Sequence, residues 1–124
     1  MRQDFMTVNR YATRAGKKYE ADLMKYLRSK GQDVERLRLT GAEDEGDLLL
    51  RYPSGDRFVI EAKREKGFKL GPWLREAEVE AKNYAEHRAC YLPGFVVVHH
   101  ARSKGIGQSY VTTSLDEWLR QINT

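Results

Sequence analysis

Two short apolar segments, joined by a turn-forming tetrapeptide, occupy the middle of the chain. Residues 48–52 and residues 57–63 flank Pro53-Ser54-Gly55-Asp56, and both flanking segments are rich in Leu, Val, Ile and Phe. A connection of this length that contains proline and glycine favours a tight turn between antiparallel strands. The sequence therefore predicts a β-hairpin over residues 48–63.

Two amphipathic helices are predicted, one before and one after this hairpin. Residues 11–30 carry apolar side chains at helical spacing, and Gly31 is a natural stop after the basic last turn. Pro72 can begin the second helix, because its fixed φ suits the first helical position. That helix is expected to run to about residue 88, with a face formed by Trp73, Leu74, Ala77, Ala81, Tyr84 and Ala85.

The remaining strands are indicated by residues that favour extended structure. They are residues 34–39, 95–99 and 110–113, the last after a glycine-containing loop. Ser114 and Glu117 have the S-x-x-E spacing of a capping box, which predicts a short C-terminal helix through Ile122.

The predicted order of elements is α-β-β-β-α-β, followed by a strand and a short helix. This order describes an α/β fold, in which helices cover a mixed central sheet. At 124 residues the chain suits one domain over residues 1–124. Residues 1–10 are expected to form a flexible basic arm.

Composition excludes several classes of protein. The chain is 40% hydrophobic and 32% charged, and its apolar runs are too short to cross a bilayer, so a membrane partner is not expected. Its N-terminus lacks the apolar stretch of a secretory signal. Cys90 is the single cysteine, which excludes an internal disulfide and favours a reducing compartment. We therefore expect a cytoplasmic protein, in a bacterial, archaeal or phage-infected cell.

Charge is distributed unevenly along the chain. Residues 1–38 hold ten Lys or Arg against five Asp or Glu, and residues 63–104 hold nine against five. Residues 39–62, between them, hold two basic residues against six acidic ones. This pattern is either ordinary surface charge or a cation-binding centre flanked by surfaces that grip a polyanion such as DNA.

The candidate site lies at the ends of the predicted hairpin strands. Side chains alternate along a strand, so Glu61 and Lys63 project from one face, and Asp47 begins the strand paired with theirs. Two converging carboxylates suit Mg²⁺, for which Mn²⁺ can substitute. Lys63 can orient an attacking water or stabilise a phosphoryl transition state. The alternative is that Glu61 and Lys63 form a solvated sheet edge.

The segment Gly46-Asp47 followed by Glu61-Ala62-Lys63 resembles the PD-(D/E)xK nuclease signature, and the predicted element order resembles the core of that restriction-endonuclease-like superfamily. Gly46 stands where the motif has proline. Within the superfamily the chain is most similar to the small Holliday-junction resolvases of archaea and phages. Their first helix contains G-x-x-x-E-x-x-L-x-x-x-L, which stands here as Gly16, Glu20, Leu23 and Leu27.

This resemblance implies a catalytic set of Glu20, Asp47, Glu61 and Lys63. Glu20 is expected to join Asp47 and Glu61 as a metal ligand, and it lies on the apolar stripe of its helix, where a carboxylate needs a partner. A structural salt bridge is the alternative role for Glu20. Thr40-Gly41 lies where resolvases often carry a serine, so no hydroxyl function is assigned there.

The implied function is that of a Mg²⁺-dependent, structure-selective endodeoxyribonuclease, a homodimer that places paired symmetric nicks in four-way DNA junctions. The alternatives are a restriction-type or repair endonuclease acting on linear duplex, and a catalytically silent DNA-binding module. Trp73, Leu74 and the C-terminal helix with Trp118 are candidate dimer contacts. The expected DNA-binding residues are Arg10, Arg14, Lys17, Lys18, Arg64, Lys66, Arg102 and Lys104.

Two further polar groups have open roles. Residues 43–45, Glu-Asp-Glu, are expected to form a solvated acidic loop, with extra metal ligation as the alternative. His99 and His100 end a buried strand, but no Cys/His spacing typical of zinc accompanies them. A structural or DNA-proximal role is expected for both histidines.

Overall fold

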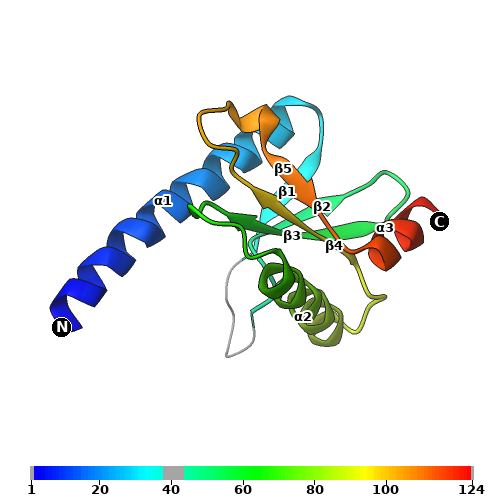
Figure 1. Cartoon of the computed structure of the whole chain (residues 1–124). Coiled ribbons are helices and arrows are strands. Elements are labelled where there is room, and N and C mark those ends of the chain that lie inside the picture. Colours follow the sequence, from blue (N-terminus) through cyan, green and yellow to red (C-terminus); the bar gives the residue numbers. More distant parts are fainter. Residues whose placement is uncertain (1, 38–43, 124) are drawn as a thin grey trace.

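The described residues form a mixed α/β domain in which three α-helices pack on one five-stranded sheet (Figure 1). The computed structural model describes residues 2–37 and 44–123, with side chains described from residue 14 onward. The helices are α1 (Arg2–Ser29), α2 (Leu70–Arg88) and α3 (Leu115–Ile122). The strands are β1 (Asp33–Arg36), β2 (Leu48–Arg51), β3 (Arg57–Lys63), β4 (Gly94–His99) and β5 (Tyr110–Thr112).

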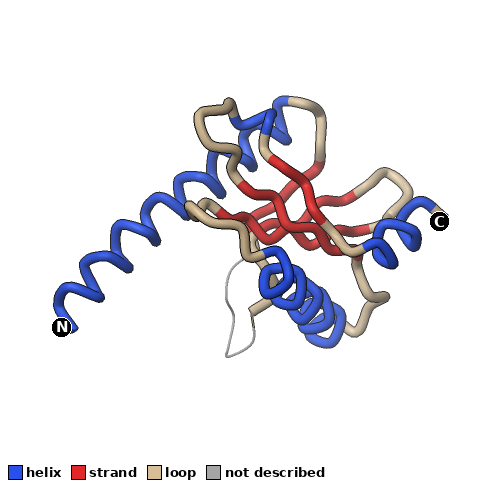
Figure 2. Tube along the Cα trace, in the orientation of Figure 1, coloured by secondary structure: helices blue, strands red, loops and turns tan. Residues whose placement is uncertain are grey.

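The predicted order of elements is confirmed, and the strands lie in the sheet in their sequence order. The predicted hairpin is also confirmed: β2 and β3 pair antiparallel, with Leu48 opposite Ile60. Strand β4 pairs parallel to β3, with Lys63 opposite His99, and the other pairs are antiparallel. The sheet is therefore mixed, because α2 carries the chain back to start β4 beside β3 (Figure 2).

Strand alternation divides the core into two layers, one on each face of the sheet. Leu48, Ile60 and Val98 pack with Leu23 of α1 on one face. On the other face, the strand residues of opposite parity, Leu49, Val59 and Val97, pack against α2. The α2 side chains in this layer are Trp73, Ala77, Ala81 and Tyr84. Helices α1 and α2 therefore bury the apolar stripes that their spacing predicted.

Some element boundaries differ from the predictions. Helix α1 begins at Arg2 rather than at residue 11, so residues 2–10 continue the helix instead of forming a separate arm, and Figure 1 shows this end extending beyond the sheet. Strand β1 ends at Arg36, and β5 at Thr112. Residues 38–43, including Thr40-Gly41, lie outside the described residues.

The C-terminal helix begins as predicted, but only one of the two hydrogen bonds of a capping box is formed. Ser114 Oγ accepts a hydrogen bond from the backbone N–H of Glu117 at 3.1 Å. The buried Glu117 carboxylate turns instead to the N–H of Phe95 and to Arg120, and so fixes α3 against the start of β4. None of the helices within the described residues is long and apolar enough to cross a lipid bilayer.

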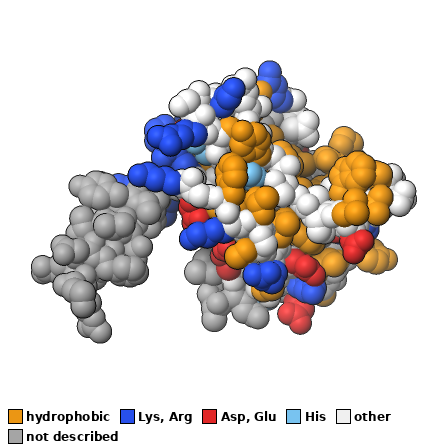
Figure 3. All heavy atoms as spheres, viewed as in Figure 1, with side chains coloured by type: hydrophobic (Ala, Val, Ile, Leu, Met, Phe, Trp, Pro, Cys, Tyr) orange, Lys and Arg blue, Asp and Glu red, His pale blue; other side chains and the backbone are white. Residues whose placement is uncertain are grey.

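Trp73 is only 4% exposed and packs into the core on the α2 face. Its prediction as a dimer contact is therefore wrong, because α2 uses this side chain to cover its own sheet. The apolar side chains of α3 are exposed instead, and they are Leu115, Trp118, Leu119 and Ile122. Figure 3 shows apolar side chains gathered over α3, on the right of the view.

Candidate functional site

The hairpin brings Asp47 and Glu61 together through backbone pairing. The N–H of Asp47 donates to the carbonyl of Ile60 at 3.1 Å, and Asp47 Oδ2 accepts the N–H of Ala62 at 2.7 Å. These two bonds hold the Asp47 carboxylate across the strand from Glu61, which is itself 4% exposed. The structure thus places the two predicted metal ligands side by side.

The backbone conformation of Gly46 explains why this position, immediately before Asp47, is not occupied by proline. Its φ is +105°, whereas the proline ring fixes φ near about −65°. A Cβ at this position would also lie 2.5 Å from Cγ1 of Val59. This backbone therefore requires glycine immediately before the aspartate.

Glu20 reaches the same site from α1. Its Oε2 lies 2.8 Å from Arg36 Nη2, so the ion pair considered as an alternative is present. The Glu20 carboxylate also faces Asp47 closely enough to contribute to the raised pKa of that residue. Glu20 therefore forms the salt bridge that was considered as its alternative role, and it also lies beside the Asp47 carboxylate.

Lys63 occupies the end of β3, two residues beyond Glu61 and on the same face. Its Nζ lies 2.9 Å from Glu76 Oε2, and its side chain is 17% exposed. Burial alone would lower the pKa of Lys63, but Glu76 and Glu61 outweigh it and raise the pKa above its ordinary value. Lys63 is therefore a protonated amine held beside the carboxylates.

Helix α2 supplies two carboxylates that were not among the predicted site residues, Glu76 and Glu80. Each places one oxygen so that it, the other and an oxygen of Glu61 all lie within 4.8 Å of one another. Glu80 is 2% exposed and lies on the stripe of Ala77, Ala81 and Tyr84. A carboxylate on an apolar stripe is the signal that singles out Glu20, and the same signal could have identified Glu80.

The electrostatics of the cluster favour a bound cation. Burial is the main cause that raises the pKa values of Asp47 and Glu61 well above the ordinary carboxyl range. Glu61 adds to the rise at Asp47, whereas at Glu61 the hydrogen bond with Asp47 lowers the pKa and Glu80 raises it. Burial likewise raises the pKa of Glu80 to about 8. Glu61 Oε2 and both carboxylate oxygens of Glu80 have no hydrogen-bond partner within the described part of the chain. A divalent cation with oxygen ligands fits this donor set, because it would neutralise the charge and satisfy these oxygens.

Exposed basic residues follow the strand that carries the acidic cluster and the strand beside it, and others lie on α1. Arg64 and Lys66 follow the end of β3, and Arg102 and Lys104 follow the end of the adjacent parallel strand β4. The predicted residues Arg14, Lys17 and Lys18 are exposed on α1, whereas the side chain of Arg10 lies outside the described set. Figure 3 shows Lys and Arg side chains gathered at the upper left, over α1 and the β4–β5 loop.

The acidic segment at residues 43–45 is only partly as predicted. Glu45 is 3% exposed and pairs with His87, at 2.7 Å, and with Arg88, so the prediction of a solvated loop is wrong for this residue. Its charge is buried because α2 supplies two partners from more than forty positions away. Asp44 is exposed and accepts the N–H of Gly46 at 2.9 Å, and Glu43 lies outside the described residues.

The two histidines occupy structural positions. His99 is buried, its Nε2 lies 2.8 Å from Thr112 Oγ1, and its ring contacts those of Phe68, Trp73 and Tyr110. His100 packs edge-on against Tyr19 with a centroid separation of 5.7 Å. These contacts join β4 to its neighbours at the end of the sheet where Lys63 lies.

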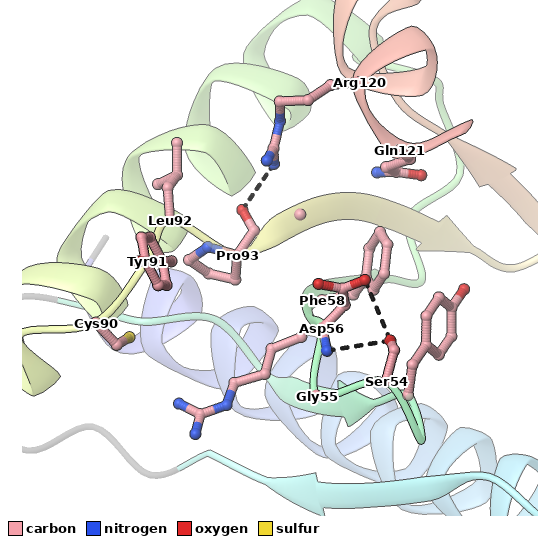
Figure 4. Close-up of a pocket in the computed structure, with 13 residues that line it drawn as sticks. Ser54, Gly55, Asp56, Phe58, Cys90, Tyr91, Leu92, Pro93, Arg120 and Gln121 are labelled. Atoms are coloured by element: carbon pink, nitrogen blue, oxygen red, sulfur yellow. Dashed lines mark hydrogen bonds between the residues drawn. The ribbon is translucent and has the colours of Figure 1, made fainter. Parts of the chain in front are cut away.

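An open pocket of about 550 Å³ lies at the opposite end of the hairpin (Figure 4). It is bounded by the 53–56 turn, residues 90–94 and α3, and Arg120 donates to the carbonyl of Pro93 at 3.2 Å across its rim. None of the predicted site residues lines this pocket. The carboxylate cluster therefore remains the candidate functional site.

Comparison of the chain with protein-family models gives no match, and comparison with curated proteins gives none either.

Proposed function

We propose that this protein is a metal-dependent endodeoxyribonuclease of the PD-(D/E)xK, restriction-endonuclease-like type. The observation that carries the proposal is the convergence of Asp47, Glu61 and Lys63 on one face of one hairpin. Burying charged side chains costs free energy unless they have partners of opposite charge, so a cluster of them favours a functional role. The α-β-β-β-α-β order around a mixed sheet supports the same assignment.

Asp47 and Glu61, with Glu20 beside them, would hold Mg²⁺ or Mn²⁺. A cation held there lowers the pKa of a bound water and stabilises negative charge on the phosphate. The Lys63 amine, protonated and positioned by Glu76, would donate hydrogen bonds to a phosphate oxygen or orient the attacking water. The hydrogen bond from Ala62 to Asp47 keeps the first carboxylate in place.

The proposed substrate is DNA, bound mainly through its phosphates. The exposed basic side chains proposed to bind it come from α1 and from the segments after β3 and β4, so they belong to separate parts of the fold. Phosphate contacts carry no base information, which suits an enzyme that selects DNA by shape. This distribution supports a structure-selective enzyme.

A four-way junction is the substrate that we propose, with the protein acting as a homodimer. A twofold dimer presents two identical sites, as paired nicks on opposing strands require. The exposed apolar stripe of α3 supports self-association, because none of the residues that the structure describes covers it.

The proposal is tested by incubating the protein with a labelled four-way junction and with a linear duplex of the same sequence. A resolvase should nick opposing strands of the junction in Mg²⁺, leave the linear duplex largely intact, and sediment as a dimer. Equal cutting of both substrates would contradict the proposed preference for junctions but would still support nuclease activity. Absence of cutting on either substrate, with DNA binding retained, would instead indicate a DNA-binding module.

A further inference from the structure

Helix α2 directs two glutamates toward the buried end of Glu61. Glu76 and Glu80 are four residues apart, so they lie on neighbouring turns of the same helix face. One oxygen from each, together with one from Glu61, forms a group whose members all lie within 4.8 Å of one another. This group lies on the α2 side of the hairpin, whereas Glu20 approaches Asp47 from α1.

Glu80 is the distinctive member of this group. It is 2% exposed, and neither of its oxygens has a hydrogen-bond partner among the residues that the structure describes. The charged groups that act on it are themselves carboxylates, those of Glu61, Asp44 and Glu76. Lys63, the nearby amine, is paired with Glu76 rather than with Glu80. A carboxyl group buried in this setting either keeps its proton or binds a cation, and the described protein residues supply no cation to it.

We propose that Glu61, Glu76 and Glu80 form a divalent-cation site of their own, on the α2 side of the hairpin. The ligands are hard carboxylate oxygens, which suit Mg²⁺ or Mn²⁺ rather than zinc. Three protein ligands leave coordination positions for water or for a phosphate oxygen. Asp47 and Glu20 are not ligands of this site.

The site has two consequences for catalysis, and both rest on the nuclease function proposed above. Glu61 would belong to two neighbouring carboxylate groups, the one with Asp47 and the one with Glu80. Glu76 would contact both the cation and Lys63, so occupation of the site would fix the amine relative to the phosphate. Cation binding itself does not depend on nuclease activity.

Binding of Mn²⁺ in the absence of DNA tests the site directly. The number of bound ions and their affinity are measured by electron paramagnetic resonance on the wild type, Asp47→Asn, Glu80→Gln and Glu76→Gln. Glu78→Gln is the matched control, because Glu78 is exposed on the same helix and pairs with Lys82. The melting temperature of each variant, with and without Mg²⁺, verifies folding and gives a second readout.

Glu80→Gln should weaken binding at the α2-side site by about tenfold or more, and Glu76→Gln should do so less strongly because that side chain is more exposed. Asp47→Asn and Glu78→Gln should keep this site. Unchanged Mn²⁺ binding in folded Glu80→Gln, or loss of all binding in Asp47→Asn, would overturn the proposal. A wild type that binds Mn²⁺ in this pattern but cuts no DNA would contradict only the nuclease function.

Discussion

Glu20 and Arg36 form an ion pair, with 2.8 Å between Oε2 and Nη2, that fastens α1 to the first strand of the sheet. The Arg36 side chain also donates to the backbone carbonyl of Lys17, one turn earlier on the helix. Because the Glu20 carboxylate is among the groups that raise the pKa of Asp47, the same residue is both a structural anchor and a neighbour of the candidate site. The two roles predict different results on mutation.

Glu20→Gln keeps the shape of the side chain and removes its charge. We expect cleavage to fall by about 100-fold, the size of effect that follows when one electrostatic interaction with a transition state is removed. The free energy of unfolding should change by about 1 kcal/mol or less, because the ion pair is partly solvated. Cleavage assays and thermal melts measure the two effects.

The control for Glu20 is Asp22→Asn, which removes an exposed carboxylate paired with Lys18 on the same helix. It should leave both cleavage and melting temperature nearly unchanged. Large destabilisation of Glu20→Gln with cleavage retained would assign this residue a structural role only.

The buried glutamate of α2 predicts a pH dependence for the metal-free protein. The pKa of Glu80 is raised from its ordinary 4.5 to about 8, so between these values the folded protein keeps a proton that the unfolded chain has released. The contribution of Glu80 to stability should therefore fall as the pH rises through this interval and level off above it. In chelator, the melting temperature of the wild type should fall as the pH rises through this interval. In Glu80→Gln the same fall in melting temperature should be smaller by a few °C. A fall of the same size in the variant would contradict the raised pKa.

The basic end of α1 predicts the salt dependence of DNA binding. Replacing Arg10, Arg14, Lys17 and Lys18 together with alanine should flatten the plot of log affinity against log salt by about 0.9 for each phosphate that the variant no longer neutralises. Fluorescence anisotropy over a salt series measures the slope. Changing Lys25, in the last turns of α1, and Lys30, just after the helix, should leave the slope unaltered. If the fourfold variant has the same slope as the wild type, these α1 side chains do not contact DNA phosphates.

The hairpin and its carboxylates could be predicted because they depend on local sequence. The turn at residues 53–56 fixes which strands pair, and strand alternation then places Glu61 and Lys63 on one face. The positions of Asp47 and Glu61 follow from that register. The element order could be predicted for the same reason, because each helix and strand has its own periodicity.

The remaining features depend on contacts between distant segments. Which sheet face α2 covers is decided by packing, so the approach of Glu76 and Glu80 to Glu61 could not be derived from helix periodicity alone. Glu45 is buried because His87 and Arg88 reach it from the end of α2. Gly46 departs visibly from the motif in the sequence, but only its φ of +105° explains why proline is excluded.

Metal-dependent cutting by the hairpin site is tested by cleavage of a labelled four-way junction by the wild type and by Asp47→Asn, each with Mg²⁺ and with excess chelator. We expect the wild type to cut in Mg²⁺ alone, and Asp47→Asn to lose cleavage by at least about 100-fold. Junction binding by the variant should be retained, because the basic side chains are untouched. Wild-type cutting in excess chelator, or near-normal cutting by Asp47→Asn, would contradict a metal-dependent nuclease built on this hairpin.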